Sequence, residues 1–98
     1  MGARFLATFL AGSALLGAAG CVAPGMAMSD INTAQAQLSA AKTADAPRLA
    51  PYEYTLAELY LKQARTRQGS ADYQEAYEYA RKATTFAKQA TDKAENHH

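Results

Sequence analysis

The sequence predicts an all-α protein: a three-helix bundle whose last two helices form a helical hairpin, preceded by an N-terminal signal segment. Two observations predict this class. Apolar residues recur every three or four residues between positions 30 and 95, as they do along an amphipathic helix. Two prolines and a glycine (Pro47, Pro51 and Gly69) divide this stretch into three segments. The chain has 98 residues, which is the size of one domain.

Residues 1–20 have the composition of a targeting segment. Arg4 is the only charged residue before Asp30, and an uncharged, mostly apolar run follows it. A positive start, an apolar run and small residues at its end are typical of a signal peptide that is removed. A retained membrane helix is the alternative, because about 20 apolar residues can span a bilayer. The glycines in the second half of the run favour removal, and we expect cleavage between Gly20 and Cys21.

Cys21 is the only cysteine in the chain, so it cannot form an internal disulfide. A catalytic thiol needs a nearby base, and the two histidines, His97 and His98, are the last residues of the sequence. A metal site needs several ligands at fixed spacings, and none flank Cys21. A buried packing residue is a further alternative, but the glycines and the proline around Cys21 do not suggest a packed element. The sequence therefore favours an attachment point.

The tetrad Ala18-Ala19-Gly20-Cys21 resembles the lipobox of bacterial lipoproteins, a row of small residues that ends in cysteine. It departs from the commonest pattern at Ala18, where leucine is more frequent. The resemblance implies a thioether-linked diacylglycerol on Cys21 and a further acyl chain, such as palmitate, on its new amino group. Two or more chains anchor a protein firmly, whereas one binds reversibly. By the enterobacterial sorting rule, Val22 in place of aspartate implies the outer membrane, with the protein facing the periplasm.

Residues 21–29 are expected to form a lipidated tether, and residues 30–96 a small α-helical domain. The tether is uncharged and contains a proline and a glycine, as loops do. The first helix is expected from Asp30 to Ala46, with Ser29 or Asp30 as its N-cap. It has one narrow apolar stripe, made of Ile31, Ala34, Leu38 and Ala41.

A rigid connector between Pro47 and Pro51 leads to the second helix, which is expected from Pro51 to Gln68. Proline suits the first turn of a helix, where its missing N–H group costs nothing. Gly69 is expected to supply a left-handed C-cap. The apolar face of this helix is expected to consist of Tyr52, Leu56, Leu59, Tyr60 and Ala64.

The third helix is expected to follow a tight turn and to extend to Glu95. Ser70 or Asp72 can cap it, and Glu75 can complete a capping box with Asp72. Its inner positions alternate three and four residues apart, which is a heptad pattern. We call them the alanine face: Tyr73, Ala76, Ala80, Ala83, Ala87, Ala90 and Ala94. This face is a candidate interaction surface for a partner helix or a second copy of the chain.

The tyrosines are expected to supply much of the contact area in the core, because alanine side chains bury little apolar surface. They cluster around the second turn of the chain, and the alternative is an exposed aromatic patch that binds a partner. The six are Tyr52, Tyr54, Tyr60, Tyr73, Tyr77 and Tyr79.

The stretch from Tyr52 to Ala83 resembles a tetratricopeptide-type helix pair, on the motifs "YEYTLAELYLKQAR" and "DYQEAYEYARKA". A single pair cannot bury its face alone, so the first helix would cover it. More specifically, these motifs resemble an uncharacterised bacterial lipoprotein family, labelled as a domain of unknown function. Some of its larger members carry an OmpA-like domain, so we expect no wall binding by that route from these 98 residues. The resemblance implies a location and a shape, but no activity.

Composition argues against several classes of function. The net charge is +1, and removal of Arg4 lowers Lys+Arg from 10 to 9 against 9 Asp+Glu, which leaves 0. We therefore expect no nucleic-acid partner. No phosphate-binding loop, metal motif or catalytic set appears, so we expect no enzyme activity, cofactor, metal or small-molecule substrate. The expected function is that of a small envelope adaptor, bound to the membrane through Cys21 and to a protein partner through helix faces. A self-associating spacer and a pilotin-like escort of a secretion-channel subunit are the alternatives.

Overall fold

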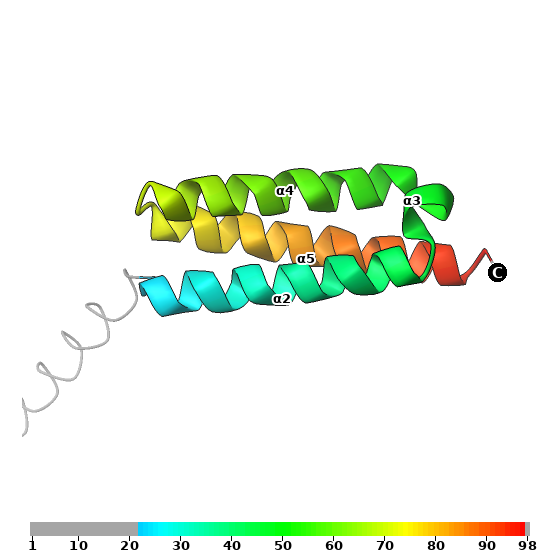
Figure 1. Ribbon diagram of the computed structural model, residues 1–98, viewed down its shortest axis with the longest axis horizontal. Helices are drawn as coiled ribbons and strands as arrows, with labels where there is room; N and C mark the ends of the chain where they lie inside the picture. Colours follow the sequence, from blue (N-terminus) through cyan, green and yellow to red (C-terminus); the bar gives the residue numbers. More distant parts are fainter. Residues whose placement is uncertain (1–21, 98) are drawn as a thin grey trace, which may run out of the picture.

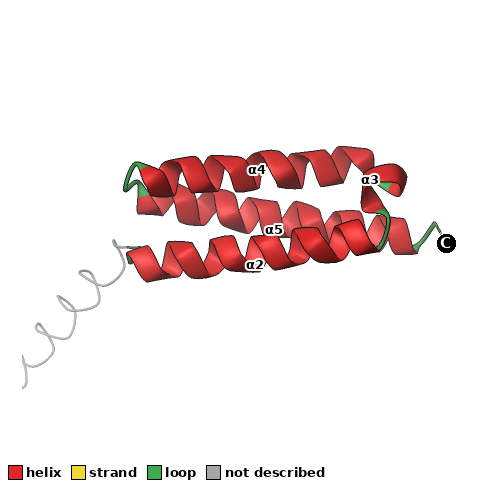
Figure 2. Cartoon of the chain, in the orientation of Figure 1, coloured by secondary structure: helices red, strands yellow, loops and turns green. Residues whose placement is uncertain are grey.

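The computed structural model describes residues 22–97. In this part of the chain there are three long helices, α2 (Pro24–Thr43), α4 (Pro51–Gly69) and α5 (Tyr73–Glu95), and a single-turn helix, α3 (Ala46–Leu49). The long helices lie side by side, with α4 antiparallel to α2 and α5 (Figure 1). The described residues contain helices and loops and no strand (Figure 2). The predicted all-α class, the three-helix bundle and the α4–α5 hairpin are confirmed.

The three long helices bury residues at the same alternating spacing of four and three. This pattern keeps one stripe of each helix facing its neighbours, as in a coiled coil. Most of the buried residues are alanines, so the helices pack with little side-chain volume between them. The buried stripes are Ala27, Ile31, Ala34, Leu38 and Ala41 in α2, Ala57, Leu61 and Ala64 in α4, and Ala76, Ala80, Ala83, Ala87, Ala90 and Ala94 in α5.

The alanine face of α5 lies inside the protein. Its six alanines are at most 1% exposed, and Tyr73 at its start is half-buried. Ala80, Ala83 and Ala87 pack with the largest core residues of α2 and α4, and Ala90 and Ala94 pack near α3. The prediction that this face binds a partner or a second copy is therefore wrong. The other two helices need α5 to cover their own stripes.

The first helix begins earlier than predicted. α2 starts at Pro24 with Ala23 in the N-cap position, and no side chain caps it. Pro24 suits this place because its fixed φ angle is already helical. Ala27 is fully buried four residues before Ile31, so the extra turn continues the apolar stripe. The predicted tether over residues 21–29 is thus wrong for its second part, and only Val22 and Ala23 separate Cys21 from the helix.

The connection between α2 and α4 contains a left-handed residue and the single-turn helix α3. α2 ends at Thr43, three residues before the expected end, and Asp45 then adopts a left-handed conformation with a φ of 68°. Asp45 accepts a hydrogen bond of 2.8 Å from Nε of Arg48 in the short helix α3. Pro51 begins α4 as predicted.

The core face of α4 is turned relative to the prediction. Tyr52 and Leu59 are 69% and 54% exposed, whereas Leu61, which the prediction omitted, is 2% exposed. Tyr60 is half-buried against the core, and Ala64 is buried as expected. The error arises because α4 carries apolar residues on two adjoining stripes, and the pattern alone does not say which one faces inward.

The turn between α4 and α5 is a Schellman motif with an unexpected residue. Gly69 was expected to be left-handed, but it is the last residue of α4, and Ala71 takes that conformation with a φ of 60°. Asp72 N–H donates to the Arg67 carbonyl at 2.8 Å, and Ala71 N–H donates to the Gln68 carbonyl at 3.0 Å. These two bonds satisfy carbonyl groups at the end of α4. Asp72 is the N-cap residue of α5 but makes no side-chain cap, so the predicted capping box is absent.

Candidate functional surfaces

The predicted lipidation site, Cys21, and the predicted cleavage point after Gly20 lie outside the described residues. The structure therefore leaves both as predictions from the sequence. Between residues 22 and 97, no helix is long and apolar enough to cross a membrane.

The described residues contain no group of three His, Cys, Asp or Glu side chains that could hold a metal ion. Their depressions are open to solvent. One of them lies between α2 and α5 and is lined by Asp30, Thr33, Arg81, Thr84, Thr85 and Lys88. Arg81 donates a hydrogen bond of 2.8 Å to the hydroxyl of Tyr77, and its guanidinium lies 5.5 Å from the centre of that ring. The hydrogen bond with Tyr77 and, less strongly, the charge of Asp30 raise the pKa of Arg81. Arginine stays protonated in proteins, so Arg81 cannot act as a general acid or base.

Three aromatic rings and a lysine form a cluster where α4 meets α5. The ring of Tyr60 from α4 stacks against Tyr79 and Phe86 of α5, with centroid distances of 6.0 and 5.6 Å. Lys82 Nζ lies 5.5 Å from the centre of the Tyr60 ring and 5.7 Å from that of Tyr79. Aromatic pairs and cation–π contacts of this kind stabilise a surface beyond the area that they bury. The sequence does not reveal this cluster, because Tyr79 and Phe86 are seven residues apart on α5 and Tyr60 comes from another helix.

Ion pairs lie on either side of this cluster. Lys93 Nζ of α5 lies 3.5 Å from Oε2 of Glu53 in α4. Arg67 Nε lies 3.4 Å from Oε2 of Glu75, and this second pair lacks hydrogen-bond geometry. Solvent reaches at least one partner of each pair, so these pairs contribute little stability, but they match charges along the α4–α5 contact. Burial raises the pKa of the Tyr54 hydroxyl, and the carboxylate of Glu58 raises it further, so Tyr54 stays neutral at neutral pH.

A second apolar stripe on α4 faces away from the core. It consists of Tyr52, Leu56 and Leu59, which are four and three residues apart and therefore lie on one side of the helix. Tyr52 and Leu59 are exposed, and Leu56 is half-buried. We call this stripe the α4 outer strip. It has the spacing by which one helix presents apolar side chains to another protein.

Two segments at one end of the bundle lack charged residues. Residues 22–29, which include the first turns of α2, and residues 68–71, which join α4 to α5, contain no Asp, Glu, Lys or Arg. The two segments lie at the same end of the bundle (Figure 1). Gln68 Nε2 lies 3.8 Å from the sulfur of Met28 and connects them. We call these two segments the uncharged tip.

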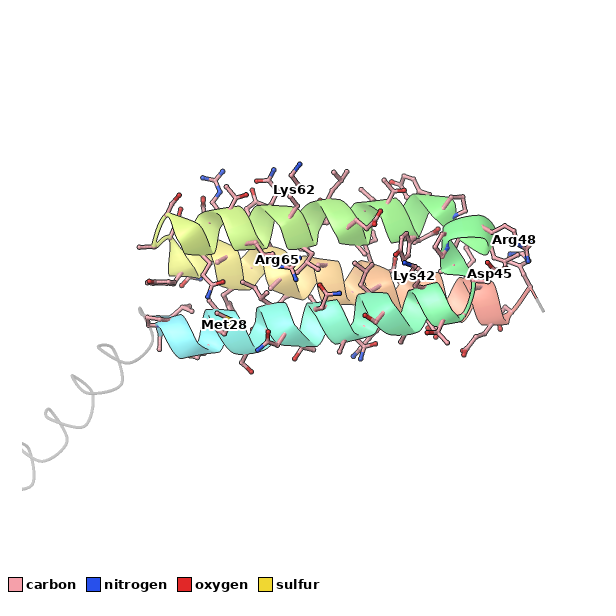
Figure 3. The ribbon with its side chains drawn as sticks, in the orientation of Figure 1. Met28, Lys42, Asp45, Arg48, Lys62 and Arg65 are labelled. Carbon is pink, nitrogen blue, oxygen red and sulfur yellow. The ribbon has the colours of Figure 1, made fainter. Side chains whose placement is uncertain are left out.

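The opposite end of the bundle is charged. Lys42, Asp45 and Arg48 lie there, far from Met28 (Figure 3). The last turn of α5 reaches the same end and adds Lys93. The bundle therefore has two chemically different ends.

A comparison with protein families places the helical part of the chain. The family described as "Domain of unknown function (DUF4398)" matches residues 29–97. No curated protein and no solved structure matches the chain. The family match includes all of α3, α4 and α5 and most of α2, which is well over half of the chain. This chain is therefore a member of the DUF4398 family.

Proposed function

We propose that this protein is a non-enzymatic lipoprotein, held on the periplasmic face of the outer membrane by lipid on Cys21, that binds a protein partner there. The observation that carries the proposal is the tetrad Ala18-Ala19-Gly20-Cys21 at the end of an apolar segment. A diacylglycerol on the thiol and an acyl chain on the amino group would anchor the bundle stably. This role also accounts for a lone cysteine without a base or metal ligands beside it in the sequence.

The α4 outer strip is the proposed partner-binding surface. The alanine face is buried between α2, α4 and α5, so a spacer that self-associates through it lacks support. Tyr52 and Leu59 are instead exposed on α4 without a described neighbour to cover them. Apolar side chains at this spacing can fit a groove on a partner protein. An adaptor that binds by packing needs no catalytic group.

Radiolabelled palmitate tests the lipid anchor. We expect label in the wild-type protein and none in Cys21→Ser, because the thioether and the processing that follows both need the thiol. The wild-type protein should sediment with the outer membrane, and Val22→Asp should move it to the inner membrane in a host that obeys the enterobacterial rule. Label that persists in Cys21→Ser would contradict the proposal.

Cross-linking in intact cells tests the partner surface. The variant Leu59→Glu should lose a cross-linked product that the wild-type protein forms, because it places a charge in an apolar contact. The matched control is Gln89→Glu, which adds the same charge at an exposed position on a different helix, α5. Both variants should remain folded, since neither position is in the core. Equal cross-linking by Leu59→Glu and Gln89→Glu would contradict an adaptor role for the α4 outer strip.

A further inference from the structure

We infer that the uncharged tip rests directly on the lipid surface, with Met26 and Met28 in contact with the bilayer, so that the bundle stands upright on the membrane. The inference rests on the proposed lipidation of Cys21 and goes further, because it identifies a second contact with lipid and fixes which end of the protein faces it.

The first argument is the length of chain between the anchor and the fold. Cys21 is separated from Pro24, the first residue of α2, by only two residues. An extended chain covers at most about 3.6 Å per residue, so the start of α2 lies within about 11 Å of the lipidated residue. That distance is comparable with the thickness of the headgroup region, into which interfacial segments insert by about 5–10 Å. If Cys21 is lipidated, the beginning of the bundle must therefore lie at the membrane surface.

The second argument is the composition of the end that arrives there. The segments 22–29 and 68–71 are far apart in the sequence, yet both lack charged residues and both lie at this end. Met26 and Met28 are 47% and 46% exposed and are among the few large apolar side chains that the described residues leave open. Methionine is flexible and apolar, and adapts to an irregular surface. An uncharged surface with exposed methionines is matched to lipid.

The third argument is the contrast with the other end. Lys42, Asp45 and Arg48 of both signs surround the α2–α4 connection (Figure 3). Bringing such groups out of water costs free energy, so this end is suited to the aqueous phase. Charges border the tip at Asp30, the residue after Ser29, at Asp72, where the helix dipole of α5 favours a carboxylate, and at the Arg67–Glu75 pair. The end that carries the uncharged segments is thus the end next to the proposed anchor, Cys21.

An upright bundle sets the height of the partner surface. α2 has 20 residues, which corresponds to a helix about 30 Å long. The α3 end would stand at about this height above the lipid. The α4 outer strip begins near that end, since α4 starts beside α3 and runs back toward the tip (Figure 1). A partner would then meet the strip away from the headgroups.

Fluorescence quenching by lipid tests the inference. The lipid-modified full chain would carry one introduced cysteine labelled with bimane, and would be reconstituted in phosphatidylcholine vesicles containing a lipid with a doxyl group near its headgroup. The thiol of Cys21 would be blocked by its thioether, so the label would report one position. We expect loss of fluorescence for Met28→Cys and Ser70→Cys, and none for the matched control Thr43→Cys, an exposed position at the other end of α2. Equal quenching at positions 28, 70 and 43, or none at 28 and 70, would overturn the inference.

A spacer variant separates the tip contact from the anchor. Insertion of a Gly-Ser linker between Val22 and Ala23 lengthens the connection and leaves the lipobox and the bundle intact. The double substitution Met26→Lys and Met28→Lys should reduce quenching at position 70 in the spacer variant, while palmitate still enters the protein. Unchanged quenching after this substitution would contradict a contact made by the methionines. If palmitate does not enter the wild-type chain, the anchor itself fails; if it enters and the tip is not quenched, only the inference about the tip fails.

Discussion

Replacing Leu61 with alanine should lower the free energy of unfolding by about 2–5 kcal/mol. Leu61 is 2% exposed and packs with Ile31, Leu38 and the alanines of α5 in the main core cluster. Most of its neighbours are alanines, whose short side chains cannot move to fill the space that a shortened residue leaves. Urea denaturation of a soluble form that begins at residue 22, followed by the helical circular dichroism signal, would measure the change.

Leu59 supplies the matched control. It is the same residue type in the same helix, two positions earlier, and it is 54% exposed. Leu59→Ala should change the free energy of unfolding by about 0.5 kcal/mol or less. A loss at position 59 equal to that at position 61 would show that α4 presents a different face to the core.

Enlarging the alanine face should also destabilise the protein. Ala83 is 1% exposed and lies in the cluster with Leu61 and Ala57. A leucine there would force α5 away from its neighbours, at a cost of about 1–3 kcal/mol. The same urea titration would measure it, with light scattering to follow association.

The matched substitution Ala36→Leu tests whether the effect comes from burial. Ala36 is exposed in the middle of α2, so leucine meets solvent there and should change stability by about 0.5 kcal/mol or less. If Ala83→Leu were tolerated as well as Ala36→Leu, or if it increased stability in an oligomer, the alanine face would be an intermolecular surface after all.

The helices of this protein follow from its sequence, but the orientation of one of them does not. In α2 and α5 the apolar residues at alternating spacings of four and three form one continuous stripe, and the predicted inner positions from Ile31 to Ala41 and from Ala76 to Ala94 are the buried ones. In α4, apolar residues occupy two stripes. Tyr52 and Leu59 look as suitable for a core as Leu61 does, and only the packing of three helices decides between them.

The helix ends differ from the predictions for a local reason. Ser29 and Asp30 are good N-cap residues, but the helix continues through them to Pro24 because Ala27 gains burial. Gly69 is a good left-handed residue, yet the chain places Ala71 there. A left-handed alanine costs about 1–2 kcal/mol, and the tertiary contacts of the α4–α5 hairpin outweigh this preference.

Some of the candidate surfaces can be predicted from the sequence, and others cannot. The tetrad that resembles a lipobox and ends at Cys21 is contiguous, so the sequence alone is enough to predict it. The uncharged tip joins residues 22–29 to residues 68–71, and the aromatic cluster joins Tyr60 to Tyr79 and Phe86. Such surfaces exist only when the helices are paired in a particular register, so no local pattern in the sequence predicts them.

Mass spectrometry of the intact protein, extracted from membranes with detergent, is the most direct test of the central claim that Cys21 carries lipid. We expect a single chain that begins at Cys21 and has the added mass of a diacylglycerol and one further acyl group, with fragment ions that place both on the first residue. A chain that retains residues 1–20, or one that begins at Cys21 with an unmodified thiol, would contradict the claim.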